Sequence, residues 1–217
     1  METWVIVAPF SLHGKRQVFY SGGVMSEVQS TFRLQPGDVA PEFQLPEPGG
    51  EIHSLSGLKG QQGLLVFFAC NHCPYVIHLA EAVGKLAEEV ASKGVNTVAI
   101  MSNDITNYPE DHPKLMGSFA ADSGWSFPYL YDENQEVAKA WSAACTPDFF
   151  LLDARGLLFY AGQFDGSRPK KGGEVNGIDM RNAIDSLIAG EDPPQNPFPS
   201  SGCNIKWKDG NEPAYFG

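Results

Sequence analysis

The sequence predicts an α/β domain of three layers, in which helices cover both faces of a mixed central sheet. Residues 64–69 (LLVFFA) and 95–101 (VNTVAIM) are short, continuous apolar runs, a pattern typical of strands buried on both faces. A helical pattern separates the two runs, and parallel neighbouring strands need such a connection. A strand–turn–strand pattern near the end of the domain adds antiparallel strands, which makes the sheet mixed.

The elements of the first half follow in order. Pro and Gly turn signals surround two extended pieces, residues 41–45 and 51–55, and predict a β-hairpin. Residues 74–90 carry apolar side chains at helical spacing and begin with a proline, which fits the first turn of a helix. Residues 109–122 also predict a helix, in which Pro113 must lie in the first turn or break it.

The second half completes the sheet. Residues 128–131 predict a short strand, and residues 133–143 predict a helix with one apolar face. Residues 148–153 (DFFLLD) and 157–163 flank an Ala-Arg-Gly turn and predict an antiparallel hairpin. Residues 177–189 predict the final helix.

The chain length of 217 residues fits one domain with extensions. We place the domain at residues 34–190, preceded by an N-terminal arm, 1–33, and followed by a tail, 191–217. The tail is extended and rich in proline at its start. Because it ends with apolar residues such as Trp207 and Tyr215, we expect it to dock on the domain.

Charge and hydropathy exclude several classes of protein. With 15 basic and 26 acidic side chains the net charge is −11, which disfavours binding to nucleic acids and to anionic membranes. The sequence has no apolar run long enough for a bilayer and starts without a recognisable secretory signal, so we expect a cytoplasmic protein. Met25 is an alternative start, and the oligomeric state is left open.

The most informative motif is Cys70-Asn71-His72-Cys73, between the strand at 64–69 and the helix at 74–90. A helix N-terminus stabilises a thiolate, so we expect Cys70 to be the attacking sulfur. Two intervening residues bring both sulfurs within disulfide distance, and Cys73 then resolves the mixed disulfide. His72 places a titratable charge beside the pair and tunes its potential.

Two alternatives to a redox pair are a structural disulfide and a metal site. Zinc needs about four ligands, usually from a second Cys or His pair. Cys145 and Cys203 stand alone in the sequence, so a dithiol redox centre is favoured, without metal or organic cofactor. A metal-binding or metal-delivery module remains the least favoured function.

Thr146-Pro147 directly precedes the strand at 148–153, where a proline fits the first residue or an irregular turn. If the peptide bond is cis, Thr146 would offer its backbone N–H and C=O groups to an extended substrate chain. The neighbouring Cys145 could act as a third redox thiol, and Cys203 could reach back from the tail. We expect both to be packed as small hydrophobic residues, with the redox role left open.

Several segments together carry a family resemblance: GDVAPEFQLP, FFACNHCPYV, CTPDFFLLD and GCNIKW. Over residues 36–215 the chain resembles the thioredoxin fold, and within it the peroxiredoxin-like branch (alkyl hydroperoxide reductase and thiol-specific antioxidant). The resemblance implies a thioredoxin-like fold with Cys70 and Cys73 as redox centre and Pro147 as a cis proline.

The chain departs from true peroxiredoxins, which carry Pro-x-x-x-Thr/Ser-x-x-Cys and a later arginine. Alignment on Cys73 places Cys70 at the Thr/Ser position and Val66 at the Pro position, while the arginine position falls near Pro147. Arg168 is a candidate substitute that the sequence does not place. Because the peroxide-activating groups are missing, we favour exchange with protein or small-molecule disulfides and thiols, with hydroperoxide reduction as the alternative.

The chain also departs from thioredoxins. Many of these carry a buried carboxylate on the strand before the motif, which relays protons. Residues 64–69 contain no Asp or Glu, so another proton acceptor is needed. His72 is the candidate that the sequence offers.

Overall fold

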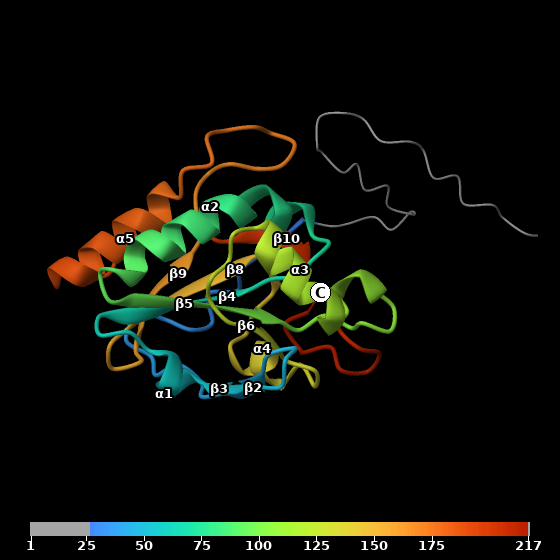
Figure 1. Ribbon diagram of the computed structural model, residues 1–217. Coiled ribbons are helices and arrows are strands. Elements are labelled where there is room, and N and C mark those ends of the chain that lie inside the picture. Colours follow the sequence, from blue (N-terminus) through green and yellow to red (C-terminus); the bar gives the residue numbers. More distant parts are fainter. Residues whose placement is uncertain (1–26, 217) are drawn as a thin grey trace, which may run out of the picture.

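The computed structural model describes residues 27–216, which form a five-stranded central sheet (Figure 1). The strand order is β6-β5-β4-β8-β9. Strands β4, β5 and β6 are parallel, whereas β8 and β9 pair antiparallel, so the predicted mixed sheet is confirmed. The strands of this sheet are β4 (Gly63–Phe68), β5 (Val95–Met101), β6 (Tyr129–Tyr131), β8 (Asp148–Asp153) and β9 (Leu158–Gly162).

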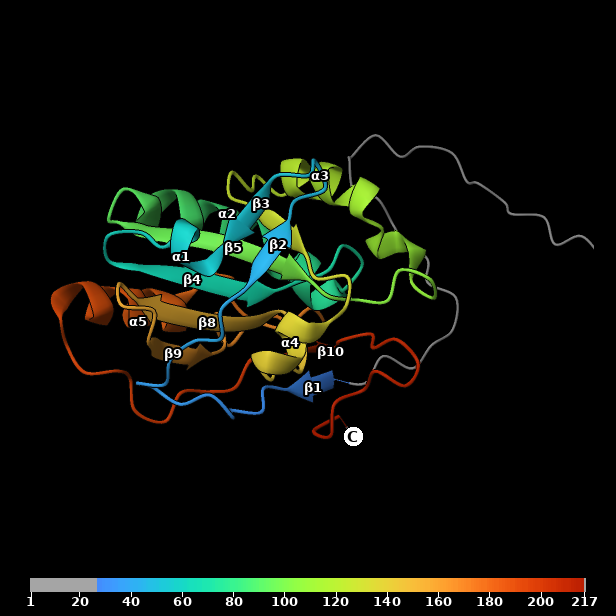
Figure 2. The same cartoon turned by 90° about the horizontal axis from the view of Figure 1, so that it is seen from below.

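Both faces of the sheet are covered, which confirms the three predicted layers (Figures 1 and 2). Leu65 and Phe67 of β4 pack with the helices of one face, and Leu64, Val66 and Phe68 pack on the other. The first face carries the helices α2 (Pro74–Ala91), α3 (Pro113–Asp122) and α5 (Ile178–Ala189). The second face carries α4 (Glu136–Ala140), α1 (Leu55–Leu58) and the predicted hairpin of β2 (Gln44–Pro46) and β3 (Ile52–Ser54).

Two helices differ from the prediction. The segment 109–122 is divided into a 3₁₀ turn, Pro109–Asp111, and α3, which begins at Pro113. His112 lies between them in an extended conformation, as the residue before a proline prefers. The helix predicted at 133–143 is shorter, because α4 covers only Glu136–Ala140. Among the described helices, none combines the length and the apolar character needed to cross a membrane.

A second, small sheet brings both ends of the described chain together. It has the antiparallel order β1-β10-β7, with β1 (Glu27–Gln29), β10 (Ser201–Asn204) and β7 (Cys145–Thr146). Figure 2 shows β1 and β10 side by side. The sequence analysis assigned none of these three strands. Most of the predicted arm, including Met25, lies outside the described residues.

Candidate active site

The Cys70–Cys73 motif joins the end of β4 to the start of α2. Cys73 is the N-cap residue of α2, and Pro74 occupies the first turn, where its missing N–H leaves no backbone donor unused. The four cysteines all lie in the described part of the chain and are present as thiols. Each of the two thiols is among the causes that shift the pKa of the other. The structure thus places both cysteines at the start of α2, Cys73 as its N-cap residue and Cys70 three residues before it.

The Thr146–Pro147 loop faces both sulfurs, and its peptide bond is cis, as the resemblance implied. The hydroxyl oxygen of Thr146 lies 3.7 Å from Cys70 Sγ. Cys73 Sγ donates to the carbonyl oxygen of Thr146 at 3.0 Å. Asp148 stabilises the loop through its carboxylate, which accepts hydrogen bonds from the backbone N–H of Ala144 at 3.0 Å and from the Ser30 hydroxyl at 2.6 Å.

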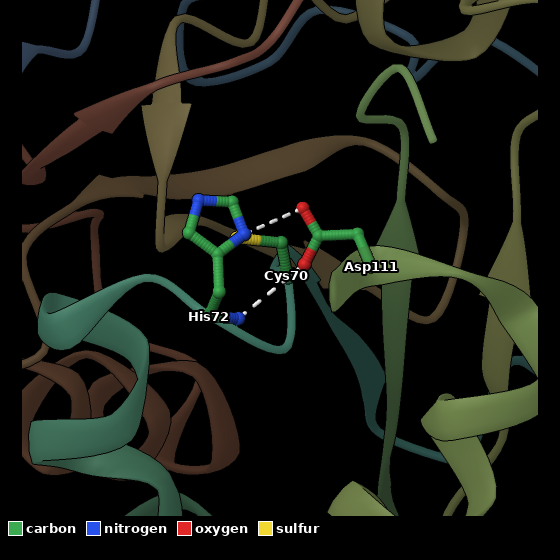
Figure 3. A group of neighbouring side chains, drawn as sticks. All are labelled: Cys70, His72 and Asp111. Atoms are coloured by element: carbon green, nitrogen blue, oxygen red, sulfur yellow. Dashed lines mark hydrogen bonds and ion pairs between the residues drawn. The ribbon is translucent and has the colours of Figure 1, made fainter. Parts of the chain in front are cut away.

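His72 pairs with Asp111, a residue that the sequence analysis missed (Figure 3). His72 Nδ1 lies 2.7 Å from Asp111 Oδ2 and 3.9 Å from Cys70 Sγ. The other carboxylate oxygen of Asp111 accepts the backbone N–H of Asn71 at 2.8 Å and that of His72 at 3.3 Å. Asp111 is completely buried in the 3₁₀ turn before α3. One carboxylate therefore fixes both the motif backbone and the imidazole.

Neighbouring side chains complete this framework. Asn103 Nδ2 donates to Asp111 Oδ2 at 2.8 Å, and the Tyr129 hydroxyl donates to Asn71 Oδ1 at 3.2 Å. The Tyr108 ring stacks on the His72 ring with a centroid separation of 5.8 Å. These contacts cover the sulfurs: Cys70 is 1% exposed and Cys73 is 0% exposed.

The electrostatics favour the thiolate at Cys73. Burial opposes its ionisation, but hydrogen bonds from the thiols of Cys203 and Cys70 and from the Thr146 hydroxyl outweigh burial and hold the pKa of Cys73 well below the ordinary value. The Thr146 carbonyl oxygen accepts a hydrogen bond from Cys73 Sγ and so favours the thiol form. The combined effect of the three donors on the pKa of Cys73 is larger. The positive end of the α2 dipole acts in the same direction as the donors.

At Cys70 the electrostatics act in the opposite direction and oppose the thiolate that the sequence analysis expected there. Burial, its hydrogen bond to Cys73 and the negative charge of Asp111 together raise the pKa of Cys70 well above the ordinary value. The thiol form is therefore favoured at Cys70 and the thiolate form at Cys73.

His72 is held as a cation over an extended pH range. Burial opposes its protonation, but the hydrogen bond to Asp111 and the charge of that carboxylate prevail and raise the pKa of His72 above its ordinary value. The cationic form of His72 is thus favoured beside Cys70, where it can offset negative charge that develops on that sulfur.

This shift predicts a pH-dependent stability. Because the folded pKa of His72 is raised, its stabilising contribution is complete below the unfolded pKa and is lost as the pH rises through the folded pKa. We expect the difference in unfolding free energy between wild type and His72→Gln to be largest below about pH 6.5, the ordinary pKa of histidine, and to shrink as the pH rises above it. Urea denaturation at several pH values measures it. A difference that stays constant as the pH rises would contradict the assignment.

Cys70 Sγ, His72 Nδ1 and an Asp111 oxygen lie within 4.8 Å of one another and offer three donors of the kind that zinc accepts. However, Nδ1 already pairs with Asp111, and the same carboxylate accepts two backbone N–H groups. Metal binding would have to replace the His72–Asp111 hydrogen bond. The arrangement is better matched to holding an imidazolium than to holding a metal ion.

The remaining candidates separate into two groups. Cys203 joins the same core cluster as Cys70 and Cys73, and its thiol hydrogen-bonds to Cys73. Cys145 is buried away from them and donates to the carbonyl of Pro147 at 3.4 Å. The Arg168 guanidinium donates to Gln163 and to the backbone carbonyl groups of Asp165 and Ser167, so these donors are engaged within its own loop.

The sequence analysis expected Thr146 to offer its backbone groups to an extended substrate, but in the structure that edge is occupied by β10. The Cα of Thr146 lies opposite that of Cys203 in the antiparallel pair of β7 and β10. The tail of the chain thus occupies the position that we assigned to an extended substrate. A strand of two residues formed by a distant tail leaves no periodic signal in the sequence.

Comparison with known proteins identifies the family of the chain. The model of the Redoxin family matches residues 35–178, about two thirds of the chain. The chain belongs to the Redoxin family. The family match and the observed fold confirm the resemblance to thioredoxin-like and peroxiredoxin-like proteins.

Relatives of this Redoxin protein include both kinds of redox protein. The thioredoxin-like protein YneN of Bacillus subtilis is 30% identical over 127 residues, which are 58% of this chain and 69% of that protein. Peroxiredoxin Bcp of Escherichia coli is 27% identical over 137 residues, covering 58% and 83% respectively. The crystal structure of an uncharacterized conserved protein from Geobacillus kaustophilus is 45% identical, with a TM-score of 0.82 over 85% of this chain and 97% of that one. This Redoxin protein is accordingly an oxidoreductase of thiols, disulfides or hydroperoxides.

Proposed function

We propose that this Redoxin protein is a thiol–disulfide oxidoreductase that works through a Cys70–Cys73 couple. The observation that carries the proposal is the pair of buried cysteines at the start of α2, with Thr146 against both: its hydroxyl lies 3.7 Å from Cys70 Sγ and its carbonyl oxygen 3.0 Å from Cys73 Sγ. Two thiols held together at a helix N-terminus are placed both to attack a disulfide and to close one.

The cycle transfers two electrons. The thiol proton of Cys70 passes to Cys73, and Cys70 attacks a substrate disulfide beside His72, whose cationic form is favoured there. A bond forms between Cys70 and one substrate sulfur, while the substrate S–S bond breaks and its second sulfur leaves and takes up a proton. Cys73, again deprotonated, then attacks Cys70 Sγ and releases the first substrate sulfur. An external dithiol or small thiol reduces the Cys70–Cys73 disulfide.

Burial of both sulfurs supports small disulfides as substrates over polypeptides. The test compares three oxidants with dithiothreitol as the terminal reductant: bis(2-hydroxyethyl) disulfide, insulin and hydrogen peroxide. We expect wild type to reduce the small disulfide fastest, and Cys70→Ser to reduce it no faster than dithiothreitol alone.

Cys145→Ser is the matched control, because it removes a buried thiol outside the cluster and should keep wild-type activity. Full activity of Cys70→Ser with the small disulfide would refute the proposal. A loss of activity in Cys145→Ser as large as that in Cys70→Ser would refute it as well.

Hydroperoxide reduction is a second candidate, favoured by the low pKa of Cys73 in a site closed to bulky molecules. The Cys73 thiolate would attack a peroxide oxygen, becoming a sulfenic acid and releasing an alcohol or water. Cys70 would condense with the sulfenic acid, forming the Cys70–Cys73 disulfide and releasing one water molecule.

The double variant Cys70→Ser/Cys203→Ser isolates this reaction, since it removes both thiols that contact Cys73. We expect dimedone to label Cys73 after peroxide treatment if the protein is a peroxidase. Absence of the label, together with peroxide consumption no faster than by a simple thiol, would exclude this candidate.

We propose that the protein acts in the cytoplasm, where thiol pools keep a dithiol couple reduced.

A further inference from the structure

Cys203 lies on the same side of the small sheet as the redox pair. Its Cα is directly opposite that of Thr146, and residues opposed in this way carry their side chains on one face. The Thr146 hydroxyl is 3.7 Å from Cys70 Sγ, so this face looks toward the motif. The thiol of Cys203 reaches Cys73 and forms a hydrogen bond with it. Cys145, one residue before Thr146, points to the other face.

The chain holds Cys203 there by close backbone contact. β10 lies between β1 and β7 and pairs with both. A Cβ atom at Gly202 would lie 2.0 Å from the carbonyl oxygen of Thr146, so only glycine permits this approach. Cys203 itself is 1% exposed. The tail therefore presents this sulfur to the site as a fixed part of it.

The charge on Cys73 keeps Cys203 protonated in the dithiol form. The hydrogen bond with Cys73, then burial, raise the pKa of Cys203 far above the ordinary value, and only Lys206 acts clearly against them. Once Cys73 enters a disulfide it carries no charge, and the largest cause of this shift disappears. Oxidation of the pair thus makes Cys203 a better nucleophile at the moment when a disulfide is present beside it.

We propose that Cys203 is a third redox thiol, which moves the disulfide from Cys70–Cys73 to Cys73–Cys203. The Cys203 thiolate attacks Cys73 Sγ, the Cys73–Cys203 bond forms, and the Cys70–Cys73 bond breaks. Cys70 leaves as a thiolate and takes up the proton that Cys203 lost. No electrons enter or leave, so the step needs no further oxidant. It rests on the proposed Cys70–Cys73 couple and returns Cys70 to the reduced form, ready for another substrate.

The test oxidises wild type and single variants with diamide, quenches them in acid and maps disulfides by mass spectrometry. We expect Cys70→Ser to form Cys73–Cys203, Cys203→Ser to form Cys70–Cys73, and wild type to contain both. Cys73→Ser should form neither, because Cys73 is common to both bonds. Cys145→Ser should reproduce the wild-type pattern. Far-UV circular dichroism verifies that each variant is folded.

The outcomes separate this inference from the proposed function. If Cys203→Ser forms Cys70–Cys73 but folded Cys70→Ser leaves Cys203 alkylatable, the relay is refuted and the couple stands. If neither Cys70–Cys73 nor Cys73–Cys203 forms, both fail. A Cys70–Cys203 disulfide in Cys73→Ser would refute the order of the relay. As a second variant, Gly202→Ala should reduce the yield of Cys73–Cys203, whereas Gly166→Ala, whose Cβ meets nothing within 4 Å, should not.

Discussion

Replacement of Cys73 by serine is expected to abolish turnover of disulfides and hydroperoxides alike, with a loss of about a thousand-fold or more. Cys73 is the sulfur whose pKa the surrounding donors lower, and it is common to both disulfides proposed within the chain, Cys70–Cys73 and Cys73–Cys203. A serine hydroxyl neither ionises near neutral pH nor forms a disulfide. The measurement is kcat/KM with bis(2-hydroxyethyl) disulfide and with hydrogen peroxide.

The comparison with Cys145→Ser shows whether the loss is specific, because both substitutions remove a fully buried thiol. We expect Cys145→Ser to stay within a few-fold of wild type. If the Cys73→Ser protein kept about a tenth of the wild-type rate, the reacting sulfur would have to be another cysteine.

Asp111→Asn is expected to lower the free energy of unfolding by about 3 kcal/mol, the lower end of the range for breaking a buried ion pair. The substitution keeps the shape of the side chain, and its amide oxygen can still accept the backbone N–H groups of Asn71 and His72. It removes the charge that holds the His72 imidazolium at 2.7 Å. The pKa of His72 should consequently fall, because burial alone disfavours its charged form.

Urea denaturation and the NMR titration of His72 measure these two effects. Asp122→Asn is a suitable control, since Asp122 is exposed at the end of α3 and should change the stability by less than about 0.5 kcal/mol. If Asp111→Asn leaves the His72 titration unchanged, Asp111 does not hold the imidazolium.

The central sheet and its helices could be predicted from the sequence because each is a local pattern. The apolar run at residues 64–69 matches β4, and the proline that follows Cys73 marks the start of α2. The same local signals located the dithiol motif between strand and helix, as well as Pro147 before β8.

The missing parts depend on contacts between distant residues. Asp111 lies 39 residues beyond His72 and reaches it only because Pro113 interrupts the helix and leaves a 3₁₀ turn in place. The lowered pKa of Cys73 could not be predicted, since Cys203, whose thiol contributes to it, comes from the tail. No periodicity within the motif carries that information.

The pairing of β10 with β7 has a kinetic consequence for any extended polypeptide that uses the Thr146 edge. A tethered strand competes at an effective concentration of roughly millimolar or more, and dilution does not weaken it. Such a polypeptide must wait for the strand to detach, so its turnover would level off at the rate of that opening. A small oxidant that reaches the sulfurs without detachment of β10 is not limited in this way. Its turnover rate would rise in proportion to its concentration.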